Sequence, residues 1–386
     1  MAEWIGINRR ARRCYGFDEV ALVPGAQTVN PNEVNANFEF NGKKFKIPIL
    51  AAAMDGVVNV RFAIEMSRLG GIAVLNLDGI QTRYENPDDV LEEISKATPQ
   101  KATELIQKVY TTPIKEKLVS KRVAEIKKAK AMACVSCIPA NAEKFSKLAI
   151  AAGADIFVVQ STVATIKHIS TQYKTLNLEK FCKSIKIPVI LGNCVTYETT
   201  LDLMSTGASG LLIGVGPGAA CTTRGVLGIG VPQVTATVDA AGARDFYYKR
   251  TGKYVSIITD GGMNRGGDIC KAFACGADAV MIGSSFARAQ EAPGRGFHWG
   301  MATSHVNLPR GTRIQVGTTG TLKDILLGPA KVDDGSQNLL GALKTSMGSL
   351  GASDLKDMHD VEIIIAPSIQ TEGKIFQEGQ RVGMGK

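Results

Sequence analysis

Cys221 follows a glycine-rich loop, Gly-Val-Gly-Pro-Gly at residues 214–218, and lies three residues before Arg224. Glycine lets a backbone approach a ligand closely and adopt positive φ without strain. A cysteine near a positive charge can have a lowered pKa and act as a thiolate nucleophile. The same stretch also fits a tight strand-to-helix turn with a buried, inert cysteine, because a lone glycine-rich loop is a weak signal.

Polar residues, glycines and one methionine also follow most of the other apolar runs of the chain. They are Met54 and Asp55 after the first run, Gln160, Ser161 and Thr162 after the fourth, Asn193 after the fifth, Asp260, Gly261 and Gly262 after the seventh, and Gly283 and Ser284 after the eighth. Backbone N–H groups at Gly262, Gly283 and Ser284 can cradle a phosphate, and Asp260 can accept two ribose hydroxyls. Each turn alone could be an ordinary connection, but together they predict a nucleotide site.

The elements that must position these residues alternate between strand-like and helix-like segments. Strand-like apolar runs occupy residues 47–53, 71–76, 131–137, 155–160, 187–192, 210–215, 254–259 and 279–282, and helical patterns follow at 60–69, 142–152, 162–173, 199–205, from about 223, and at 266–275. Such runs indicate a parallel sheet covered on its faces. Eight of them favour a closed (β/α)8 TIM barrel, whose active site lies at the carboxyl ends of the strands.

Two segments are too long to be ordinary connections. Residues 80–130 are rich in Glu, Lys and Leu and predict a helical insertion, whereas residues 291–338 are rich in Gly, Pro and Thr and suit an active-site flap. We therefore interpret residues 1–386 as a single catalytic barrel domain with an N-terminal arm over 1–45. The polar tail beyond Ala366 is expected to be frayed or used at a subunit contact.

Composition limits the classes of protein that remain. The chain has 386 residues, 45% hydrophobic and 21% charged, and its apolar runs are strand-sized, so we expect a globular protein outside the membrane. The first 17 residues place arginines after the apolar residues, the reverse of a signal peptide, which favours the cytoplasm. The eight cysteines do not predict a disulfide framework, and Cys134 and Cys137 lack a second pair that would complete a zinc site.

The net charge of +9 suits an anionic ligand or a nucleic-acid surface. Much of the excess lies in four arginines between residues 9 and 13 and in lysines between 101 and 130. The lysines alternate with Glu104, Glu116 and Glu125, and few aromatic residues accompany them. A solvated helix face is the better interpretation, so we expect no nucleic-acid partner.

Taken together and in order, several motifs resemble the IMP dehydrogenase/GMP reductase family. They are the stretch from Gly214 to Arg224, Gly230-Val231-Pro232-Gln233, Asp260-Gly261-Gly262, Met281-Ile282-Gly283-Ser284 and Glu291-Ala292-Pro293-Gly294, with Phe17 to Val20, Ala53-Met54-Asp55 and Gln370 to Gly373 extending the match. The resemblance covers the chain except residues 80–130 and part of the flap. IMP dehydrogenases usually carry a pair of CBS regulatory domains at 80–130, and this chain resembles the related subclass without them.

The resemblance implies NAD-dependent oxidation of IMP to XMP. Cys221 would attack C2 of the purine, hydride would leave to NAD, and the resulting thioimidate would be hydrolysed, with Thr223 positioning the reacting group or water. Asp260 would hold the ribose, Gly262, Gly283 and Ser284 the phosphate, and Met54, Gly300 and Met301 the base, with Gly218, Gly261 and His298 completing the substrate-binding set. Gln160, Ser161, Thr162, Asn193, Gly214 and Gly216 would line the dinucleotide side.

The resemblance also implies a potassium or similar monovalent cation and an assembly of subunits. Carbonyl groups of Gly216, Gly218 and Cys221 would bind the cation together with Glu372 and Gly373 of a neighbouring subunit. The implied assembly is a homotetramer or an octamer.

The sequence departs from the family pattern at several positions. Ala219 and Ala52 replace serines, Gln160 replaces an aspartate, and no Arg-Tyr pair that would activate water occurs between Gly300 and Gly320. Arg310 stands where a Glu or Gln is expected, and arginine is a poor base. We hypothesise that Thr223 assisted by Arg310 activates the water, with His305 as a competing candidate.

Two other functions remain open. A GMP reductase would use the same Cys221 and release ammonia and NADP, but reductases carry a Glu in place of Arg310 and a His-Lys pair after the second strand, where this chain has Asn76-Leu77-Asp78. The stretch from Glu291 to Gly294 also has the dehydrogenase form. A nucleotide-binding regulator without catalysis is compatible with the altered flap, although the intact Cys221-Thr222-Thr223 argues against it.

Overall fold

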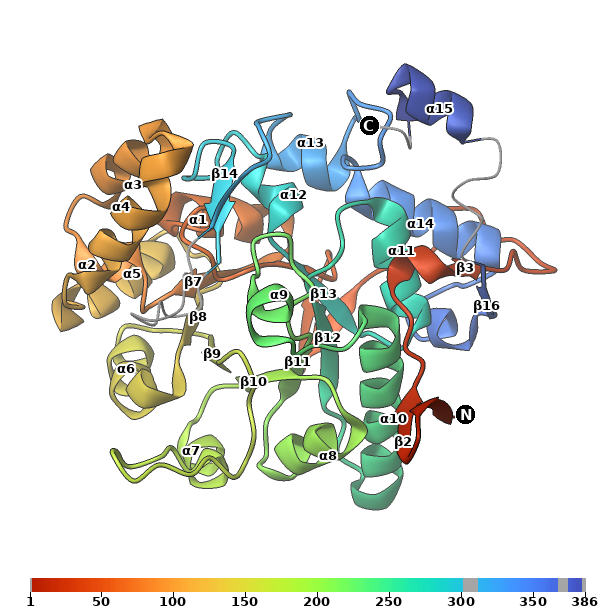
Figure 1. Ribbon diagram of the computed structural model, residues 1–386. Coiled ribbons are helices and arrows are strands. Elements are labelled where there is room, and N and C mark those ends of the chain that lie inside the picture. Colours follow the sequence, from red (N-terminus) through yellow and green to blue (C-terminus); the bar gives the residue numbers. More distant parts are fainter. Residues whose placement is uncertain (1, 301–311, 367–373, 384–386) are drawn as a thin grey trace.

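Eight parallel strands close into a barrel in the computed structural model, which describes residues 2–300, 312–366 and 374–383 (Figure 1). The strands are β6 (Ile49–Ala51), β7 (Ile72–Asn76), β8 (Cys134–Cys137), β9 (Ile156–Gln160), β10 (Val189–Cys194), β11 (Gly210–Ile213), β12 (Ser256–Asp260) and β13 (Ala279–Ile282). They pair in chain order, and β13 returns to β6 with Val280 opposite Ile49. The predicted TIM barrel is confirmed, and each of the eight apolar runs overlaps one strand.

Helices follow the strands and cover the outside of the barrel (Figure 1). They are α1 (Val60–Leu69), α6 (Pro139–Ala151), α7 (Leu178–Ser184), α8 (Tyr197–Ser205), α9 (Thr223–Leu227), α10 (Gln233–Thr251), α11 (Gly266–Ala274), α12 (Ser284–Ala287) and α14 (Leu339–Leu350). Most of the predicted helices begin within a few residues of the predicted position. Asn and Thr side chains cap several of them and so fix where they begin: Asn59 accepts from Phe62 N and Thr196 from Thr199 N.

The helix predicted over residues 162–173 is wrong. This segment consists of bends and irregular backbone, and the next helix, α7, begins only at Leu178. Its β-branched and hydroxyl residues are weak helix formers, and the Ser170 hydroxyl accepts from the backbone N–H groups of Gln172 and Tyr173. Ile169 is 91% exposed, so the apolar residues here form no buried stripe that would stabilise a helix.

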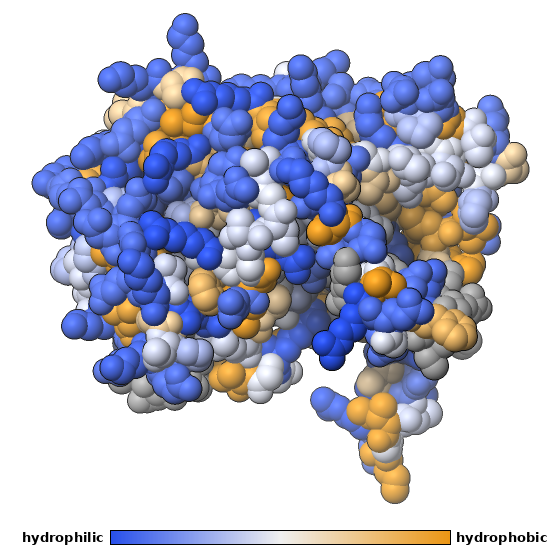
Figure 2. Space-filling view, turned by 90° about the horizontal axis from the view of Figure 1, so that it is seen from above, coloured by the Kyte–Doolittle hydropathy of each residue, from blue (hydrophilic) through white to orange (hydrophobic). Residues whose placement is uncertain are grey.

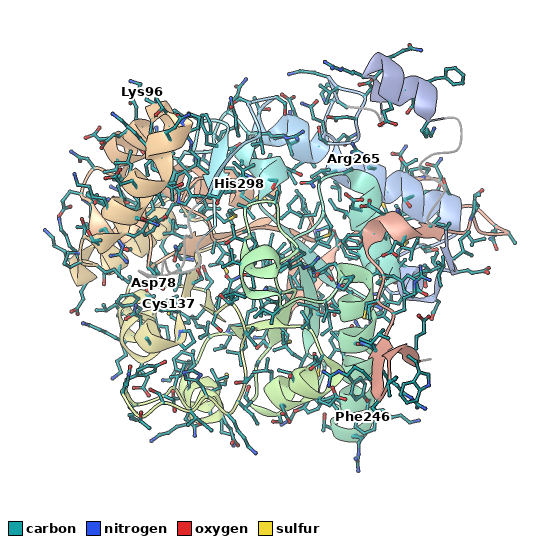
Figure 3. All side chains as sticks on the ribbon, viewed as in Figure 1. Asp78, Lys96, Cys137, Phe246, Arg265 and His298 are labelled. Atoms are coloured by element: carbon teal, nitrogen blue, oxygen red, sulfur yellow. The ribbon has the colours of Figure 1, made fainter. Side chains whose placement is uncertain are left out.

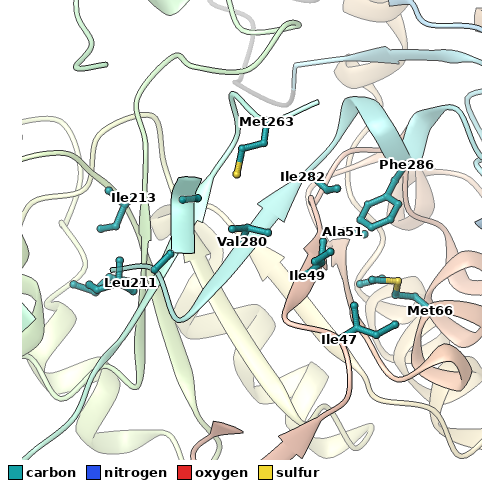
Figure 4. Close-up of a cluster of buried hydrophobic side chains, with 14 of the residues drawn as sticks. Ile47, Ile49, Ala51, Met66, Leu211, Ile213, Met263, Val280, Ile282 and Phe286 are labelled. Atoms are coloured by element: carbon teal, nitrogen blue, oxygen red, sulfur yellow. The ribbon is translucent and has the colours of Figure 1, made fainter. Parts of the chain in front are cut away.

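Alternating residues of the strands build two cores. Leu50, Leu212 and Met281 point into the barrel, whereas their neighbours in the strands face the surrounding helices. Figure 4 shows this outer layer, with Met66 of α1 and Phe286 of α12 packed beside β6 and β13. Each fully buried Leu or Ile side chain contributes about 1.5–3 kcal/mol to the free energy of unfolding. The two layers together fix the strands that carry the site.

The segment predicted as an N-terminal arm contains a plug for the barrel. The hairpin β4 (Phe38–Phe40) and β5 (Lys43–Phe45) contributes three stacked or tilted phenylalanine rings to the inner core. A Cβ added at Gly210, the first residue of β11, would lie 3.0 Å from the Phe40 ring. The hairpin therefore closes the amino-terminal end of the barrel, which leaves the opposite end for a ligand.

Other parts of the first and last residues pack against the outside. After the 3₁₀ helix η1 (Phe17–Glu19), strand β3 (Val20–Leu22) pairs antiparallel with β16 (Ile363–Ile365). Strand β16 follows a second 3₁₀ helix, η2 (Asp357–Asp360). The hairpin β1 (Ala2–Gly6) and β2 (Arg9–Arg12) is attached to α10 by an ion pair between Arg12 and Asp239. Helix α15 (Ile375–Gln380) is the last element.

The long segment between β7 and β8 forms four helices that lie together on one side of the barrel (Figure 1). They are α2 (Ile80–Arg83), α3 (Pro87–Lys96), α4 (Pro99–Thr111) and α5 (Glu116–Lys128), and we refer to residues 80–130 as the helical insertion. Its apolar residues form a separate small core around Leu91, Ile94 and Ile106. Arg122 of α5 is buried and donates to the carbonyl groups of Gln81, Tyr84 and Glu85.

Residues 291–338, expected to form a flap, include ordered elements in their described part. Strands β14 (Phe297–Trp299) and β15 (Arg313–Gln315) pair antiparallel, and α13 (Leu322–Leu327) follows. Trp299, Leu322 and Ile325 are fully buried. The two ends of the segment are therefore packed against the barrel, whereas residues 301–311 lie outside the described residues.

The surface seen from above is dominated by hydrophilic residues, with hydrophobic residues in scattered groups (Figure 2). Within the described part of the chain, no helix is both long and apolar enough to cross a membrane. All eight cysteines are free thiols, and Cys134 and Cys137 are buried in β8.

Candidate active site

The loop that connects β11 to α9, residues 214–222, carries the predicted nucleophile, and we call it the nucleophile loop. Two of its glycines are required by the geometry. Gly214 has a φ of +146°, and a Cβ there would lie 2.4 Å from the Asp260 carbonyl oxygen. Gly216 has a φ of +73°, and a Cβ would lie 2.7 Å from Cγ of Arg224. A larger residue at either position would push the loop away from β12 or from α9.

Cys221 is the one cysteine in the exposed class, and its thiol donates to Oγ1 of Thr223 over 3.2 Å. Thr223 is the first residue of α9 and is almost fully buried, so its hydroxyl is held in place beside the sulfur. The Arg224 guanidinium donates to the carbonyl groups of Val215 and Val231. Arg224 therefore joins the start of the nucleophile loop to the segment before α10, in addition to placing a positive charge near the thiol.

Asp260, at the end of β12, lies beside two residues that were predicted for the dinucleotide. Asn193 and Gln160 donate to its Oδ2 over 2.7 and 3.2 Å, and Gln160 also donates to Asn193. Desolvation raises the pKa of Asp260 to about 6, and the bond from Asn193 opposes this rise. Both bonds reach the same oxygen, so among the described residues none bonds to Oδ1, which can accept from a ligand.

The turn after Asp260 packs directly on the nucleophile loop. Gly261 and Gly262 have φ values of +83° and +82°. A Cβ at Gly261 would lie 3.2 Å from Cγ of Pro217 and 3.5 Å from the Gly218 nitrogen. The structure thus brings the predicted ribose and phosphate turn together with the predicted nucleophile.

The eighth strand ends at Gly283 and Ser284, beside two further predicted substrate residues. A Cβ at Gly283 would lie 2.8 Å from Sδ of Met54, and Ser284 Oγ lies 3.2 Å from Nε2 of His298. His298 is 1% exposed, and desolvation together with Arg288 lowers its pKa to about 4. The ring is therefore neutral near pH 7. In the view of Figure 3, His298 lies between the helical insertion and α14.

The remaining predicted residues that are described also lie at this end of the barrel. Ser161 exchanges backbone hydrogen bonds with β10, donating to Gly192 and accepting from Asn193, and Thr162 follows it. Gly300 follows β14, and a Cβ there would lie 3.1 Å from the Ala220 carbonyl oxygen, so the backbone at Gly300 lies next to the nucleophile loop. Five predicted residues lie outside the described residues: Met301, His305, Arg310, Glu372 and Gly373.

The implied cation ligands are consequently described only in part. The Gly218 carbonyl accepts from the Cys221 N–H over 3.0 Å, which forms a tight turn and leaves one lone pair of that oxygen. Gly216 and Cys221 lie on the same loop. Among the described residues, no group of three or more His, Cys, Asp or Glu side chains could hold a metal ion.

Sequence reasoning missed two groups of residues around the site. Gln233, the last residue of the Gly-Val-Pro-Gln motif, donates to the carbonyl groups of Ile213 and Asp260, and so joins the ends of β11 and β12. Tyr110, on α4, donates to Asp55 over 2.6 Å and accepts from Trp299 over 2.9 Å. The motif could have indicated Gln233, but no sequence signal connects Tyr110 to Asp55, 55 positions away.

Comparison with known proteins agrees with this geometry. Residues 14–375 match the family model described as IMP dehydrogenase/GMP reductase domain. The chain belongs to the IMP dehydrogenase/GMP reductase family. It is a member without CBS domains, because residues 80–128 form only four helices and the short connections between them.

The relatives divide into two groups. An uncharacterized oxidoreductase of Mycolicibacterium smegmatis is 37% identical, over 94% of this chain and 99% of that protein. Inosine-5′-monophosphate dehydrogenase of Borreliella burgdorferi is 30% identical, over 91% of this chain and 93% of that protein. The crystal structure of an IMP dehydrogenase/GMP reductase-like protein from Corynebacterium glutamicum superposes with a TM-score of 0.89 at 34% identity, over 94% of this chain and 97% of that one. The protein is thus an oxidoreductase of this family.

Proposed function

We propose that the protein oxidises IMP to XMP with NAD, through covalent attack by Cys221. The observation that carries the proposal is the exposed Cys221 thiol, bonded to a buried Thr223 and packed against the Asp260-Gly261-Gly262 turn. In this arrangement one barrel end combines a nucleophile, an acceptor for ribose hydroxyls and a glycine turn for phosphate. Family membership supports the same chemistry.

Each residue of the site has its own role in the proposed reaction. The Cys221 thiolate adds to C2 of the purine and the C2 hydride leaves, after which water adds to C2 and expels the thiolate to give XMP. The Thr223 hydroxyl lies 3.2 Å from the sulfur, where it can bind the thiolate or the attacking water. Asp260 Oδ1 accepts from the ribose, and Gly262, Gly283 and Ser284 present backbone N–H groups to the 5′-phosphate.

The dinucleotide would lie beside Gln160, Asn193 and Gly214, and its nicotinamide would accept the hydride. These residues fit a polar ligand, because Asn193 is buried with its amide fixed on Asp260 and Gly214 leaves no side chain in the way. Ser161, Thr162 and Gly216 extend the same edge. Asn193 and Gln160 orient Asp260, so ribose binding and dinucleotide binding depend on the same hydrogen bonds.

Strand β7 supports the dehydrogenase over the reductase. It ends at Asn76 and is followed by Leu77-Asp78, where reductases carry a His-Lys pair. The Asp78 carboxylate accepts from the Ile138 N–H and the Asn141 amide. Figure 3 shows Asp78 close to Cys137 on the neighbouring strand. A carboxylate used in this way joins β7 to α6 and is not free to assist the release of ammonia.

The test measures both reactions in one preparation. Purified protein is incubated with IMP and NAD, and separately with GMP and NADPH, while the absorbance of reduced nicotinamide is followed. We expect NAD reduction only in the first mixture, loss of turnover in Cys221→Ser, and full activity in the control Cys14→Ser, which removes a partly exposed thiol of the N-terminal segment. Oxidation of NADPH with GMP would favour the reductase, and tight nucleotide binding without turnover in either mixture would favour a regulator.

The potassium site and the homotetramer or octamer are part of the same proposal. Activity is expected to fall when potassium chloride is replaced by choline chloride at equal ionic strength, and to recover when potassium is restored. Sedimentation at micromolar concentration should give the mass of at least four chains. Cation-independent turnover by a monomer would contradict both expectations.

A further inference from the structure

Tyr110 connects the helical insertion to two strands that end at the active site. Its hydroxyl donates to Oδ2 of Asp55, two residues beyond the first barrel run, and accepts from the indole N–H of Trp299 at the end of β14. Asp55 and Trp299 are both fully buried. Buried polar groups are costly to leave without a partner, so these three side chains hold one another in place.

The Asp55 side of this connection leads to the purine. Oδ2 of Asp55 also accepts from the Ile80 N–H, and a Cβ at Gly79 would lie 2.2 Å from Oδ1, so the carboxylate is enclosed by the start of α2. The preceding residue is Met54, whose Sδ would lie 2.8 Å from a Cβ added at Gly283. Displacement of Asp55 would therefore displace Met54, which is the residue expected to contact the base.

The Trp299 side leads to the nucleophile. The residue after Trp299 is Gly300, whose backbone lies against the Ala220 carbonyl, and Ala220 directly precedes Cys221. The residue before Trp299 is His298, which reaches Ser284. The position of β14 thus affects both Cys221 and the predicted phosphate turn.

Two other contacts hold the same hairpin against the insertion. Arg313 of β15 donates to the carbonyl groups of Ile94, Ser95 and Ala97 at the end of α3, and its guanidinium lies over the Phe297 ring. Arg295, just before β14, pairs with Glu92 of α3. Both strands of the hairpin are therefore held by the insertion as well as by the barrel.

We propose that Tyr110 is a positioning residue, by which the helical insertion sets the placement of Met54 and, through Trp299 and Gly300, of Cys221. The inference rests on the proposed function for its kinetic consequence only, because the placement of Cys221 is measurable without any substrate. Tyr110 is not among the residues proposed to contact the nucleotide. It acts through Asp55 and Trp299, so its loss affects the geometry of attack more than the binding of ribose and phosphate.

The test compares Tyr110→Phe with Tyr84→Phe. Tyr84 is a matched control, since its hydroxyl bonds to the Val109 carbonyl and the Thr112 hydroxyl, both within the insertion. The first readout is the rate at which iodoacetamide alkylates Cys221, followed by peptide mass spectrometry without nucleotide. The second is the fluorescence emission of Trp299. It is measured in a Trp4→Phe background, because the chain has two tryptophans and this change leaves only Trp299. The third is kcat and KM for IMP oxidation.

We expect Tyr110→Phe to shift the Trp299 emission, to change the Cys221 alkylation rate by about tenfold and to lower kcat by about tenfold or more. The KM for IMP should stay within about twofold, because the ribose and phosphate contacts do not involve Tyr110. Tyr84→Phe should leave every readout within about twofold of the parent protein. Circular dichroism and thermal unfolding establish that both variants are folded.

An unchanged alkylation rate in folded Tyr110→Phe overturns the inference, and so does an equal change in Tyr84→Phe. If Tyr110→Phe does not fold, Trp299→Phe replaces it, because that change removes the indole donor and keeps an aromatic ring. The Cys221 alkylation rate then decides, since this variant no longer has Trp299 emission. A parent protein that fails to oxidise IMP contradicts the proposed function alone. The alkylation and fluorescence results still decide the role of Tyr110 in that case.

Discussion

Asn193 donates its side-chain amide to the carboxylate of Asp260 over 2.7 Å. The sequence assigned these two residues to different ligands, the dinucleotide and the ribose. In the structure they form one hydrogen-bonded group with Gln160, at the ends of three different strands. The two halves of the predicted site are therefore physically joined, and a change in one residue should affect both ligands.

The raised pKa of Asp260 predicts that nucleoside binding weakens in acid. Its pKa of about 6 means that the side chain is protonated below that pH, and a protonated carboxyl accepts fewer ribose hydroxyl bonds than a carboxylate. Inosine is the appropriate probe, because a 5′-phosphate itself titrates near pH 6. Calorimetry should show affinity falling as the pH drops through about 6 in the parent protein, and Asp260→Asn should abolish that step. Retention of the step in the variant would assign it to another group.

The buried His298 should lower the free energy of unfolding as the pH falls. The buried carboxyls should have the opposite effect. Its folded pKa of about 4 lies below the ordinary value of 6.5, so the unfolded chain binds the proton more readily. The contribution of neutral His298 to the free energy of unfolding is fully present above about pH 6.5. It falls by roughly 1–3 kcal/mol as the pH drops towards 4.

Denaturant unfolding at several pH values in the parent protein and in His298→Gln isolates this contribution. Asp55 and Asp260, whose pKa values are raised to about 6, favour the folded state as the pH falls, but they act equally in both proteins. The difference in free energy of unfolding between the parent protein and His298→Gln should therefore become smaller as the pH drops from 6.5 to 4. A constant gap would mean that His298 does not titrate in this way.

Thr223→Val tests the role of the hydroxyl beside the nucleophile. Valine keeps the shape and removes the group that lies 3.2 Å from the Cys221 sulfur. If Thr223 activates water, NAD should be reduced in a rapid first turnover and steady-state turnover should then fall by about a hundredfold. Thr222→Val is the matched control, since the Thr222 side chain makes no capping hydrogen bond to α9. Normal steady-state turnover in Thr223→Val would rule out this role.

The competing candidates for water activation are Arg310 and His305, which lie outside the described residues. Arg310→Ala and His305→Ala should be measured in the same single-turnover experiment as Thr223→Val. Accumulation of the thioimidate in Arg310→Ala would support assistance by that residue. Normal hydrolysis in Arg310→Ala with accumulation in His305→Ala would transfer the role to the histidine.

Gly283→Ala should weaken nucleotide binding more than it destabilises the fold. The new Cβ would lie 2.8 Å from Sδ of Met54, which is flexible and can shift, but the shift moves Met54 from its place beside the base. We expect IMP affinity to fall by about tenfold, measured by calorimetry. Gly267→Ala is the control: its Cβ would meet nothing within 4 Å, and the change should stabilise α11 by about 0.5–1 kcal/mol. Equal IMP affinity in both variants would contradict the expectation.

Local patterns were sufficient to predict the barrel, because each strand is a short apolar run between Gly, Pro or polar turns. The inner and outer faces of β6 show why: both Leu50 and Ile49 are buried, so the run is continuously apolar. The same reasoning failed over residues 162–173. There the spacing of apolar residues suggested a helix, but Ser170 turns the chain and Ile169 stays in solvent.

The candidate nucleophile and its turns were also readable from the chain, since a parallel barrel places every strand end on one side. Cys221, Asp260 and Gly283 needed no knowledge of tertiary contacts to be selected. The partners of these residues did need it. The bonds from Asn193 and Gln160 to Asp260 join strand ends that are 67 and 100 positions apart in the chain.

What the sequence determined by itself was therefore the barrel, the order of its strands and the identity of the chemical groups at their ends. These depend on local hydrophobicity and turn residues, which act over a few neighbouring positions. Only the tertiary structure decided that Tyr110 of the insertion meets Asp55 and Trp299. That contact depends on how the small core of α2 to α4 packs against the barrel, and packing between segments far apart in the chain leaves no periodic mark in either of them.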